Sequence, residues 1–458
     1  MLSVIELLNK YDVAGPRYTS YPTLPVWANQ VTAADYQTSL SQIRRDDQLS
    51  LYVHIPFCEN QCHFCACSRI ATTDHSLSAN YVHTVIKELE LVAQNLQNTK
   101  APVTQIHFGG GSPNFLHPTE LSLIMRAINK HFDVLQSAEL AIEINPKTTS
   151  PAFCAVLGRE GFNRVSLGVQ DFSAQVQQLI HRHQTSEDTQ NTLSQLKTHG
   201  VTHFNFDLVY GLPGQSLRTF QTTLETVLSL DPDRLAIYSY AHLPWTQDKQ
   251  RSFDERDLPS NKLKLKLFSE ALQFLTAHNY HQIGLDHFAK TNDELYQALK
   301  NKTIHRNFMG YSTRAQAHQI GLGATSISFV NGNYFQNEKN VVDYQNLIAK
   351  QQLATTKGHL LSHDDTIRRD LINQIMCHQF VDITVFEKKH TIHFADYFKN
   401  ELLRLKEFAA DGLVTLDNNI LAVTRQGQIT LRNIAMCFDA FLHQRDVNTI
   451  KTKFSRTI

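Results

Sequence analysis

The sequence lacks an excess of charge of either sign. Lysine and arginine together number 43, and aspartate and glutamate also number 43. Proteins that bind nucleic acid or an anionic membrane surface usually carry a basic excess. We therefore expect no nucleic-acid partner and no membrane partner. A negatively charged substrate would have to be held by a few local arginines.

The sequence also lacks the segments that direct a chain into or across a membrane. It contains no apolar run of about 18 residues, the length that a membrane-spanning helix needs. The first residues show no basic stretch followed by a continuous apolar one, so we expect no secretory signal peptide. The 7 cysteines are an odd count, which argues against a disulfide scaffold. We expect a cytoplasmic protein in a reducing compartment.

What the sequence does contain is a dense group of cysteines. Cys58, Cys62, Cys65 and Cys67 follow one another with the spacing C-x3-C-x2-C-x-C. Structural zinc prefers two ligand pairs separated by a dozen or more residues, and a second pair is missing here. Closely spaced cysteines are typical of cubic iron–sulfur clusters, and C-x3-C-x2-C would hold three irons and leave one open. An iron–sulfur cluster is favoured, with zinc and redox thiols as alternatives.

From residue 49 to about 285, short β-like runs alternate with amphipathic helix-like stretches. The predicted strands are 51–55, 104–108, 140–144, 164–169, 204–210 and 234–239. Six β/α units in a row predict a parallel sheet with helices outside. The fold class is α/β, a partial (β/α)6 TIM-like barrel followed by a mostly helical C-terminal domain.

Polar and glycine residues cluster where these strands end. They are the cysteines after the first strand, Gly109–Gly111 after the second, Glu143, Gln170–Asp171, Asp207, and Tyr240–His242 after the sixth. In β/α barrels, the loops at the carboxyl ends of the strands build the active site. The sequence therefore predicts an enzyme.

The chain outside the barrel has a different character. We expect an N-terminal arm over residues 1–45, the barrel over 46–300, and a C-terminal domain over 301–458. The last of these contains a predicted hairpin at 411–427 and a final helix over 428–442. Helices followed by a hairpin resemble a winged helix, but without a basic face we expect packing or lid function, not DNA binding.

The cysteine spacing after a first strand, with a glycine run after the second, resembles the radical S-adenosylmethionine (SAM) superfamily. Within it, the chain is similar to the oxygen-independent coproporphyrinogen III oxidases. The shared motifs are GPRYTSYPT, LYVHIPFC, C-x2-C-x-C, GVQDF, DLVYGLP, YAHLP, DHFA, HRNF-GY and RNI-MCFD. They run from residue 15 to about 440, which is nearly the whole chain.

This resemblance implies a ligand set. Cys58, Cys62 and Cys65 would ligate a 4Fe-4S cluster, and Cys67 would lie near it without ligating. A first SAM would be held by Tyr52, Gly110, Glu143 and Ile327. A second SAM would be held by Phe64, Gly111, Ser112, Gln170, Arg182, Asp207 and Ala241. Tyr52 and His54 are the catalytic candidates.

The resemblance also implies an activity. A 5′-deoxyadenosyl radical would drive oxidative decarboxylation of two propionates of coproporphyrinogen III to vinyl groups, giving protoporphyrinogen IX. The electron donor would be a protein such as flavodoxin, and the chain would be a monomer. The alternatives are a haem chaperone or haem-binding protein that keeps the cluster motif, and another radical enzyme acting on a tetrapyrrole. Arg17 and Arg306 are candidates for binding substrate carboxylates.

Two residues depart from the family pattern. Ala66 stands where glycine is expected, and Ser112 replaces the usual threonine. If the loop needs a positive φ at residue 66, alanine would cost about 1 kcal/mol. Three other cysteines, Cys154, Cys377 and Cys437, stand singly in helix-like stretches and are expected in the core.

Overall fold

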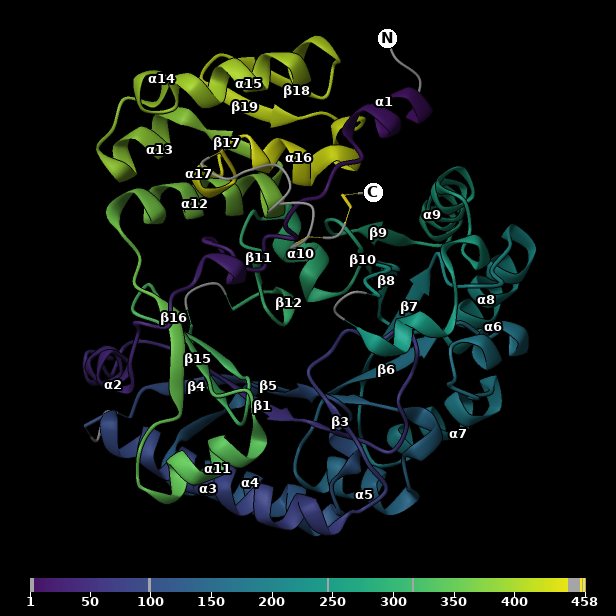
Figure 1. Ribbon diagram of the computed structural model, residues 1–458, viewed down its shortest axis with the longest axis vertical. Helices are drawn as coiled ribbons and strands as arrows, with labels where there is room; N and C mark the ends of the chain where they lie inside the picture. Colours follow the sequence, from purple (N-terminus) through teal and green to yellow (C-terminus); the bar gives the residue numbers. More distant parts are fainter. Residues whose placement is uncertain are drawn as a thin grey trace.

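The computed structural model describes residues 4–97, 100–244, 247–314, 317–443, 454 and 456–457. These residues contain a large sheet with helices along its outer face (Figure 1). In spatial order its 12 strands are β16 (Thr355–His359), β15 (Asn333–Asn337), β14 (Ile327–Val330), β13 (His318–Leu322), β1 (Leu49–Ile55), β4 (Pro102–Gly110), β5 (Asp133–Ile144), β6 (Arg164–Gln170), β7 (His203–Tyr210), β8 (Arg234–Ser239), β10 (His287–Lys290) and β9 (Tyr280–Gln282).

The six predicted strands all form and pair in parallel, as β1 and β4 to β8. This confirms the α/β class and the partial barrel. Helices connect them and cover the outside, as right-handed crossovers require. These helices are α3 (Ser76–Asn95), α4 (Pro118–His131), α5 (Pro151–Arg159), α6 (Ala174–Leu179), α7 (Ser186–Thr198), α8 (Leu217–Leu230) and α9 (Asn261–Ala277).

Proline begins two of these helices, as the sequence suggested. Pro118 and Pro151 occupy first-turn positions of α4 and α5, where the missing N–H has no intrahelical partner. In front of Pro151, Ser150 accepts a hydrogen bond from the backbone of Phe153. These local signals fix where the two helices start and leave their apolar faces against the sheet.

The sheet also contains strands that the sequence pattern did not reveal. Strand β13 pairs in parallel with β1, and β14, β15 and β16 continue antiparallel from it. These strands are short and include polar residues such as Gln336 and Asn337, so their alternation is weak. The sheet thus extends past residue 300, and the division of the chain at 45 and 300 stays a prediction.

The last part of the described chain is mostly helical, as expected. It contains α12 (His363–His378), β17 (Phe380–Asp382), α13 (Ile383–His390), α14 (Phe394–Tyr397), α15 (Lys399–Ala410), β18 (Val414–Asp417), β19 (Ile420–Val423), α16 (Leu431–Met436) and α17 (Ala440–His443). Strands β18 and β19 form the predicted hairpin, with positive φ at Asn418 and Asn419. The prediction of one helix over 428–442 is wrong, because a 3-10 turn (Gly427–Thr430) and a break after Met436 divide it.

The N-terminal arm contains α1 (Val4–Tyr11) and α2 (Ala33–Ser41). Further elements outside the arm are β2 (Phe57–Cys58), β3 (Ile70–Ala71), α10 (Glu294–Lys300), β11 (His305–Asn307), β12 (Gly310–Ser312) and α11 (Val341–Ala349). Helix α1 lies against the C-terminal helices (Figure 1). The Tyr11 ring stacks on Phe408, and Lys10 pairs with Asp411. The two ends of the chain are therefore packed together.

The single cysteines outside the loop lie in the core. Cys154, Cys377 and Cys437 are all buried, which agrees with the expectation. Burial raises the pKa of each thiol. They behave as small apolar side chains.

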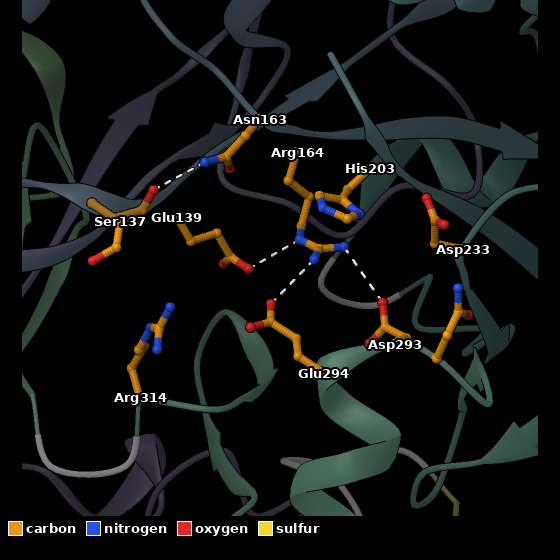
Figure 2. Close-up of a pocket in the computed structure, with 11 residues that line it drawn as sticks. Ser137, Glu139, Asn163, Arg164, His203, Asp233, Asp293, Glu294 and Arg314 are labelled. Atoms are coloured by element: carbon orange, nitrogen blue, oxygen red, sulfur yellow. Dashed lines mark hydrogen bonds and ion pairs between the residues drawn. The ribbon is translucent and has the colours of Figure 1, made fainter. Parts of the chain in front are cut away.

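Ion pairs join the amino-terminal ends of β6 and β8 to neighbouring elements, and Figure 2 shows those of Arg164 with Glu139, Asp293 and Glu294. Arg164 donates to Glu139 at 2.9 Å and to Glu294 at 3.1 Å. Arg234 pairs with Asp293 at 2.9 Å and also reaches Glu294. Strands β5, β6 and β8 are thereby tied to the start of α10 by ion pairs in which Asp293 is buried and Glu294 is 41% exposed.

None of the helices in the described part of the chain has both the length and the apolar character needed to cross a bilayer.

Candidate active site

The cysteine loop leaves the carboxyl end of β1. Cys58, Cys62 and Cys65 are half-buried and Cys67 is exposed. Burial raises the pKa of Cys58 to about 12, and the nearby thiols of Cys65 and Cys62 act in the same direction. The three thiols come from one short loop and are near enough for charge on Cys65 and Cys62 to act on Cys58.

Cys65 and Cys67 are coupled by hydrogen bonding. The Cys67 thiol donates to the Cys65 sulfur, which lowers the pKa of Cys65 and raises that of Cys67. The backbone N–H of Cys67 also points at the same sulfur, at 3.5 Å. Cys65 is thus stabilised as a thiolate, which is the form that binds iron.

The glycine run packs directly against the base of this loop. Gly110 has φ +119°, and a Cβ there would lie 2.8 Å from the His54 ring. The N–H groups of Gly111 and Ser112 donate to the carbonyls of Ile55 and Phe57 at 2.8 and 2.9 Å. A side chain at Gly110 would push the run away from the cysteine loop.

Aromatic and acidic side chains from β1, β4 and β5 face the inside of the barrel together. The Tyr52 hydroxyl lies 3.1 Å from Nδ1 of His54, and the Tyr52 ring stacks on His107 at 5.9 Å. His107 Nε2 lies 3.0 Å from Glu143 Oε1. Burial lowers the pKa of His54, so its imidazole is neutral at pH 7.

Strands β6 and β7 place a second carboxylate inside the barrel. Asp207 accepts hydrogen bonds from Ser166 Oγ and Asn205 Nδ2, both at 3.0 Å. Burial raises the pKa of Asp207 to about 6, and the negative charge of Glu143 adds to the effect. This carboxylate is held by neutral donors, an arrangement that favours a ligand bringing hydroxyl, amine or positive groups.

The end of β6 joins the same site through Arg182. Its guanidinium donates to the carbonyl of Gly168 and lies 3.5 Å from the Cys62 sulfur. Gln170 ends the strand with φ +69°, a strained conformation for a residue with a side chain. The structure therefore brings Arg182 to the cysteine loop, and the side chains of Gln170 and Arg182 both lie beside Gly168.

The remaining predicted cofactor residues are distributed around these groups. Ile327 begins β14, which is linked through β13 to Tyr52 by the pairing Tyr52↔Gly321. Phe64 lies in the cysteine loop and packs beside Tyr240. Ala241 follows β8 and lines a cavity there. Ser112 donates to Asn114 at 2.7 Å, so its hydroxyl is already engaged.

The two candidate substrate arginines meet at one carboxylate. Arg17 from the arm lies 3.4 Å from Asp286, and Arg306 lies 3.8 Å from the other oxygen of Asp286. Burial alone would raise the pKa of Asp286, but the hydrogen bond from His287 and these two arginines hold it well below its usual range. Nε and NH1 of Arg306 are buried without a hydrogen-bond partner.

The expected strain at Ala66 is absent. Ala66 does not have a positive φ, so its Cβ creates no backbone penalty. The departure from glycine therefore needs no compensation in this loop.

Sequence reasoning missed several inward-facing residues, namely His107, Ser166, Asn205 and Tyr238. Each of them either stands two residues before or after a predicted site residue or lies on the same face of its strand. Because side chains in a strand alternate between the two faces, a strict period-2 reading of the strands would have found them. Their partly buried polar side chains alternate with fully buried apolar ones along β6 and β7. The barrel interior is polar, and the apolar core lies between the sheet and the outer helices.

The donor set fits an iron–sulfur cluster. Three close thiols, one of them stabilised as a thiolate, stand next to the positive charge of Arg182. Among the described residues, no three or more His, Cys, Asp or Glu side chains converge on one point as ligands of a single ion do. Ligands of a cluster each bind a different iron and need no such convergence. The zinc alternative gains no support.

Comparisons with known proteins first define the class of protein. A family model described as the Radical SAM superfamily matches residues 52–227, which hold the cysteine loop and β1 to β7. A second model, the HemN C-terminal domain, matches residues 361–429. The barrel is therefore that of a radical SAM enzyme.

Full-length relatives then define the family. The oxygen-independent coproporphyrinogen III oxidase of Escherichia coli K12 is 38% identical over 454 residues, covering 99% of this chain and 98% of the relative. That of Helicobacter pylori J99 is 39% identical over 451 residues, covering 98% of each. The solved coproporphyrinogen III oxidase (HemN) from E. coli superposes with a TM-score of 0.90 at 37% identity, covering 95% of this chain and 98% of that one. The chain belongs to the family of oxygen-independent coproporphyrinogen III oxidases.

Proposed function

We propose that this chain catalyses the oxidative decarboxylation of two propionates of coproporphyrinogen III, giving protoporphyrinogen IX. The observation that carries the proposal is a half-buried group of three thiols facing a polar barrel interior, in a chain similar over its full length to enzymes named for this substrate. When bound, the 4Fe-4S cluster and SAM supply the radical that removes a hydrogen atom from a propionate.

The chain's own residues bind and orient these groups. Cys58, Cys62 and Cys65 hold the cluster, and Arg182 neutralises part of the thiolate charge beside Cys62. Cys67 stays outside the ligand set and supports Cys65 by donating its S–H. Gly110 lies so close to β1 that a Cβ there would clash with the His54 ring, so glycine keeps the run against the strand that carries the cysteine loop.

Two carboxylates give the interior two binding positions for SAM. Glu143, fixed by His107, takes the first with Tyr52, Gly110 and Ile327. Asp207, fixed by Ser166 and Asn205, takes the second. Its companions there are Phe64, Gly111, Ser112, Gln170, Arg182 and Ala241. A carboxylate suits the ribose hydroxyls or the ammonium group of SAM.

Tyr52 and His54 are the residues that we assign to the reacting centre. The neutral His54 holds the Tyr52 hydroxyl in place, and its Nε2 lies 3.2 Å from the carbonyl of Ser68. The pair therefore positions a polar edge beside the cluster loop without adding a charge. An electron-transfer protein such as a flavodoxin is the proposed donor, the proposed state is a monomer, and the proposed location is the cytoplasm.

The test is one anaerobic assay. Reconstituted, reduced protein is incubated with coproporphyrinogen III and SAM, and both protoporphyrinogen and 5′-deoxyadenosine are measured. Formation of both supports the proposal. SAM cleavage without protoporphyrinogen would assign the chain to another tetrapyrrole substrate, and haem binding without SAM cleavage would make it a haem carrier.

A further inference from the structure

Two cavities meet at Arg17, at the carboxyl end of β8. One measures about 740 Å³ and lies between β8, α9 and the C-terminal region, with Ile237, Phe268 and Ile429 in its wall. The other measures about 820 Å³ and is lined by Tyr240 and Ala241. Arg17 and Ser239 line both. Each has the size of a small-molecule site.

Positive charge is concentrated around these cavities. Their walls carry the cations Arg17, Lys264, Arg425, Arg432 and Arg456, against the anions Asp12, Glu255 and Asp286. The positively charged side chains thus outnumber the negative ones, and some of them are buried. Arg456 pairs with Asp12, and Arg17 pairs with Asp286. In contrast, the hydrogen bonds that hold Lys264 and the buried Arg432 go to backbone carbonyls and bring no negative charge to them.

Lys264 stands out among these cations. It comes from α9, and its methylenes cross Gly211, where a Cβ would lie 3.0 Å from Cε. Its Nζ donates to the carbonyl of Tyr240 at 2.8 Å. The ammonium group is thereby held over the end of β8, inside the cavity wall.

The surroundings of Lys264 and Arg432 disfavour the protonated, positively charged forms of both side chains. Burial lowers the pKa of Lys264 to about 8, with Asp12 opposing and the charges of Arg17, Arg432 and Arg456 adding to the effect. Burial also lowers the pKa of Arg432 to about 9, again with a contribution from Arg17. A bound carboxylate would relieve this repulsion.

We propose that Arg17 and Lys264 bind the carboxylates of the tetrapyrrole that are not reacting, with the apolar wall of α9 and β8 against its rings. This inference rests on the proposed function for the identity of the ligand. Arg17 lies 3.2 Å from the carbonyl of Ser239 and 3.4 Å from Asp286, so it is fixed at the point where the cavities join. It can hold one carboxylate from that point while Lys264 holds another.

The experiment measures binding directly, without turnover. Coproporphyrin III, the fluorescent oxidised form of the substrate, is titrated into the full-length protein lacking the cluster. We expect Lys264→Met to weaken binding about 10- to 100-fold, the loss of one charged hydrogen bond, and Lys264→Arg to restore most of it. Lys266→Met, an exposed lysine of the same helix, is the matched control and should change binding less than about twofold.

A second ligand separates charge recognition from damage to the fold. The tetramethyl ester of coproporphyrin III has no carboxylates, so wild type and Lys264→Met should bind it equally. If Lys264→Met weakens binding of the ester as much as the acid, or weakens SAM binding instead, the inference is wrong.

The outcome also distinguishes this inference from the proposed function. If wild type converts coproporphyrinogen III but Lys264→Met binds coproporphyrin like wild type, the carboxylate site is wrong and the function stands. If wild type shows no conversion and Lys264→Met still loses only the acid ligand, the carboxylate site stands and the function fails.

Discussion

Two buried carboxylates near opposite ends of the parallel strands, Glu139 and Asp207, have opposite surroundings. At the amino-terminal end, Glu139 is paired with Arg164, which holds the pKa of Glu139 low although burial alone would raise it. At the carboxyl end, burial raises the pKa of Asp207, whose partners are the neutral Ser166 and Asn205. Glu139 is neutralised from within the fold, and Asp207 is left to be completed by a ligand.

The contrast separates residues that stabilise the fold from residues that are available to bind a ligand. Strand ends in β/α barrels divide in this way, with stability at the amino-terminal face and chemistry at the carboxyl face. In this chain the charges at the first face come from β5, β6, β8 and the start of α10, and they pair within the protein. Figure 2 shows the pairs made by Arg164 of β6. Each substitution below tests one face and should leave the other unchanged.

The largest effect is expected at the cysteine loop. Cys62→Ser should abolish SAM cleavage, because an alkoxide is a poor substitute for a thiolate at iron. The measurements are the iron content and the sulfur-to-iron charge-transfer absorbance after anaerobic reconstitution, together with 5′-deoxyadenosine formation. Cys67→Ser is the control and should retain the cluster. A Cys62→Ser protein with a full cluster and normal SAM cleavage would overturn the ligand assignment.

A smaller effect, on stability alone, is expected at the amino-terminal end of the parallel strands. Arg234→Met removes the nearer cation of Asp293, whose side chain is only 3% exposed, and leaves Arg164 at 3.9 Å. Losing the charged hydrogen bonds to a buried carboxylate that keeps a more distant cation costs about 1.5–3 kcal/mol of unfolding free energy. Urea denaturation measures the change, and SAM binding by the folded protein should be unaltered.

The control for this pair is on the surface. Arg159 is 64% exposed and lies 3.4 Å from Glu160. Arg159→Met should cost about 0–1 kcal/mol. Equal losses for Arg159→Met and Arg234→Met would show that the buried ion pairs do not stabilise the strand ends.

An intermediate case is Asp207, where stability and binding should move in opposite directions. Its pKa is about 6 when folded and 3.8 in a model peptide, so its ionisation opposes folding as the pH rises through 6. Asp207→Asn should therefore raise the unfolding free energy at pH 8 by on the order of 1–3 kcal/mol, with a smaller gain at pH 5.

The same substitution should weaken binding of one SAM. Equilibrium dialysis with labelled SAM counts the bound molecules, and urea titrations at both pH values give the stability. A loss of stability at pH 8 would mean that Asp207 is structural and that its neutral partners do not represent a prepared binding site.

Much of this division could be predicted from the sequence, and particular residues show why. The β-like runs predicted the six parallel strands, and the polar residues toward their carboxyl ends, such as Glu143 and Asp207, predicted the catalytic face. The paired face escaped notice because Arg164 and Arg234 are ordinary first residues of strands. Their partners Asp293 and Glu294 stand at the start of a helix that is distant in the sequence. Only the folded structure brings this helix next to the two strands.

The same limit explains what was missed near the catalytic face. Strands β13 to β16 join the sheet through β1, a contact between residues about 270 positions apart that no local period encodes. Lys264 is one of several lysines in a helix, and only the fold shows that it lies over Gly211 while Lys266 is exposed. The cysteine spacing alone left three types of site open, namely an iron–sulfur cluster, zinc and redox thiols. The resemblance to a family supplied the cofactors and the residues expected to bind them.

The smallest effect is expected at Ala66, within the cysteine loop itself. The family pattern suggested that glycine belongs there, but Ala66 does not have a positive φ. Ala66→Gly therefore removes no strain and adds only flexibility to the unfolded chain, a loss of less than about 1 kcal/mol. Cluster content and SAM cleavage should stay within about twofold of wild type, since backbone freedom at this position is not used. A tenfold gain in SAM cleavage would show instead that the loop must adopt a left-handed conformation at residue 66 when the cluster binds, and that the catalytic face, unlike the paired face, is not fully formed by the chain alone.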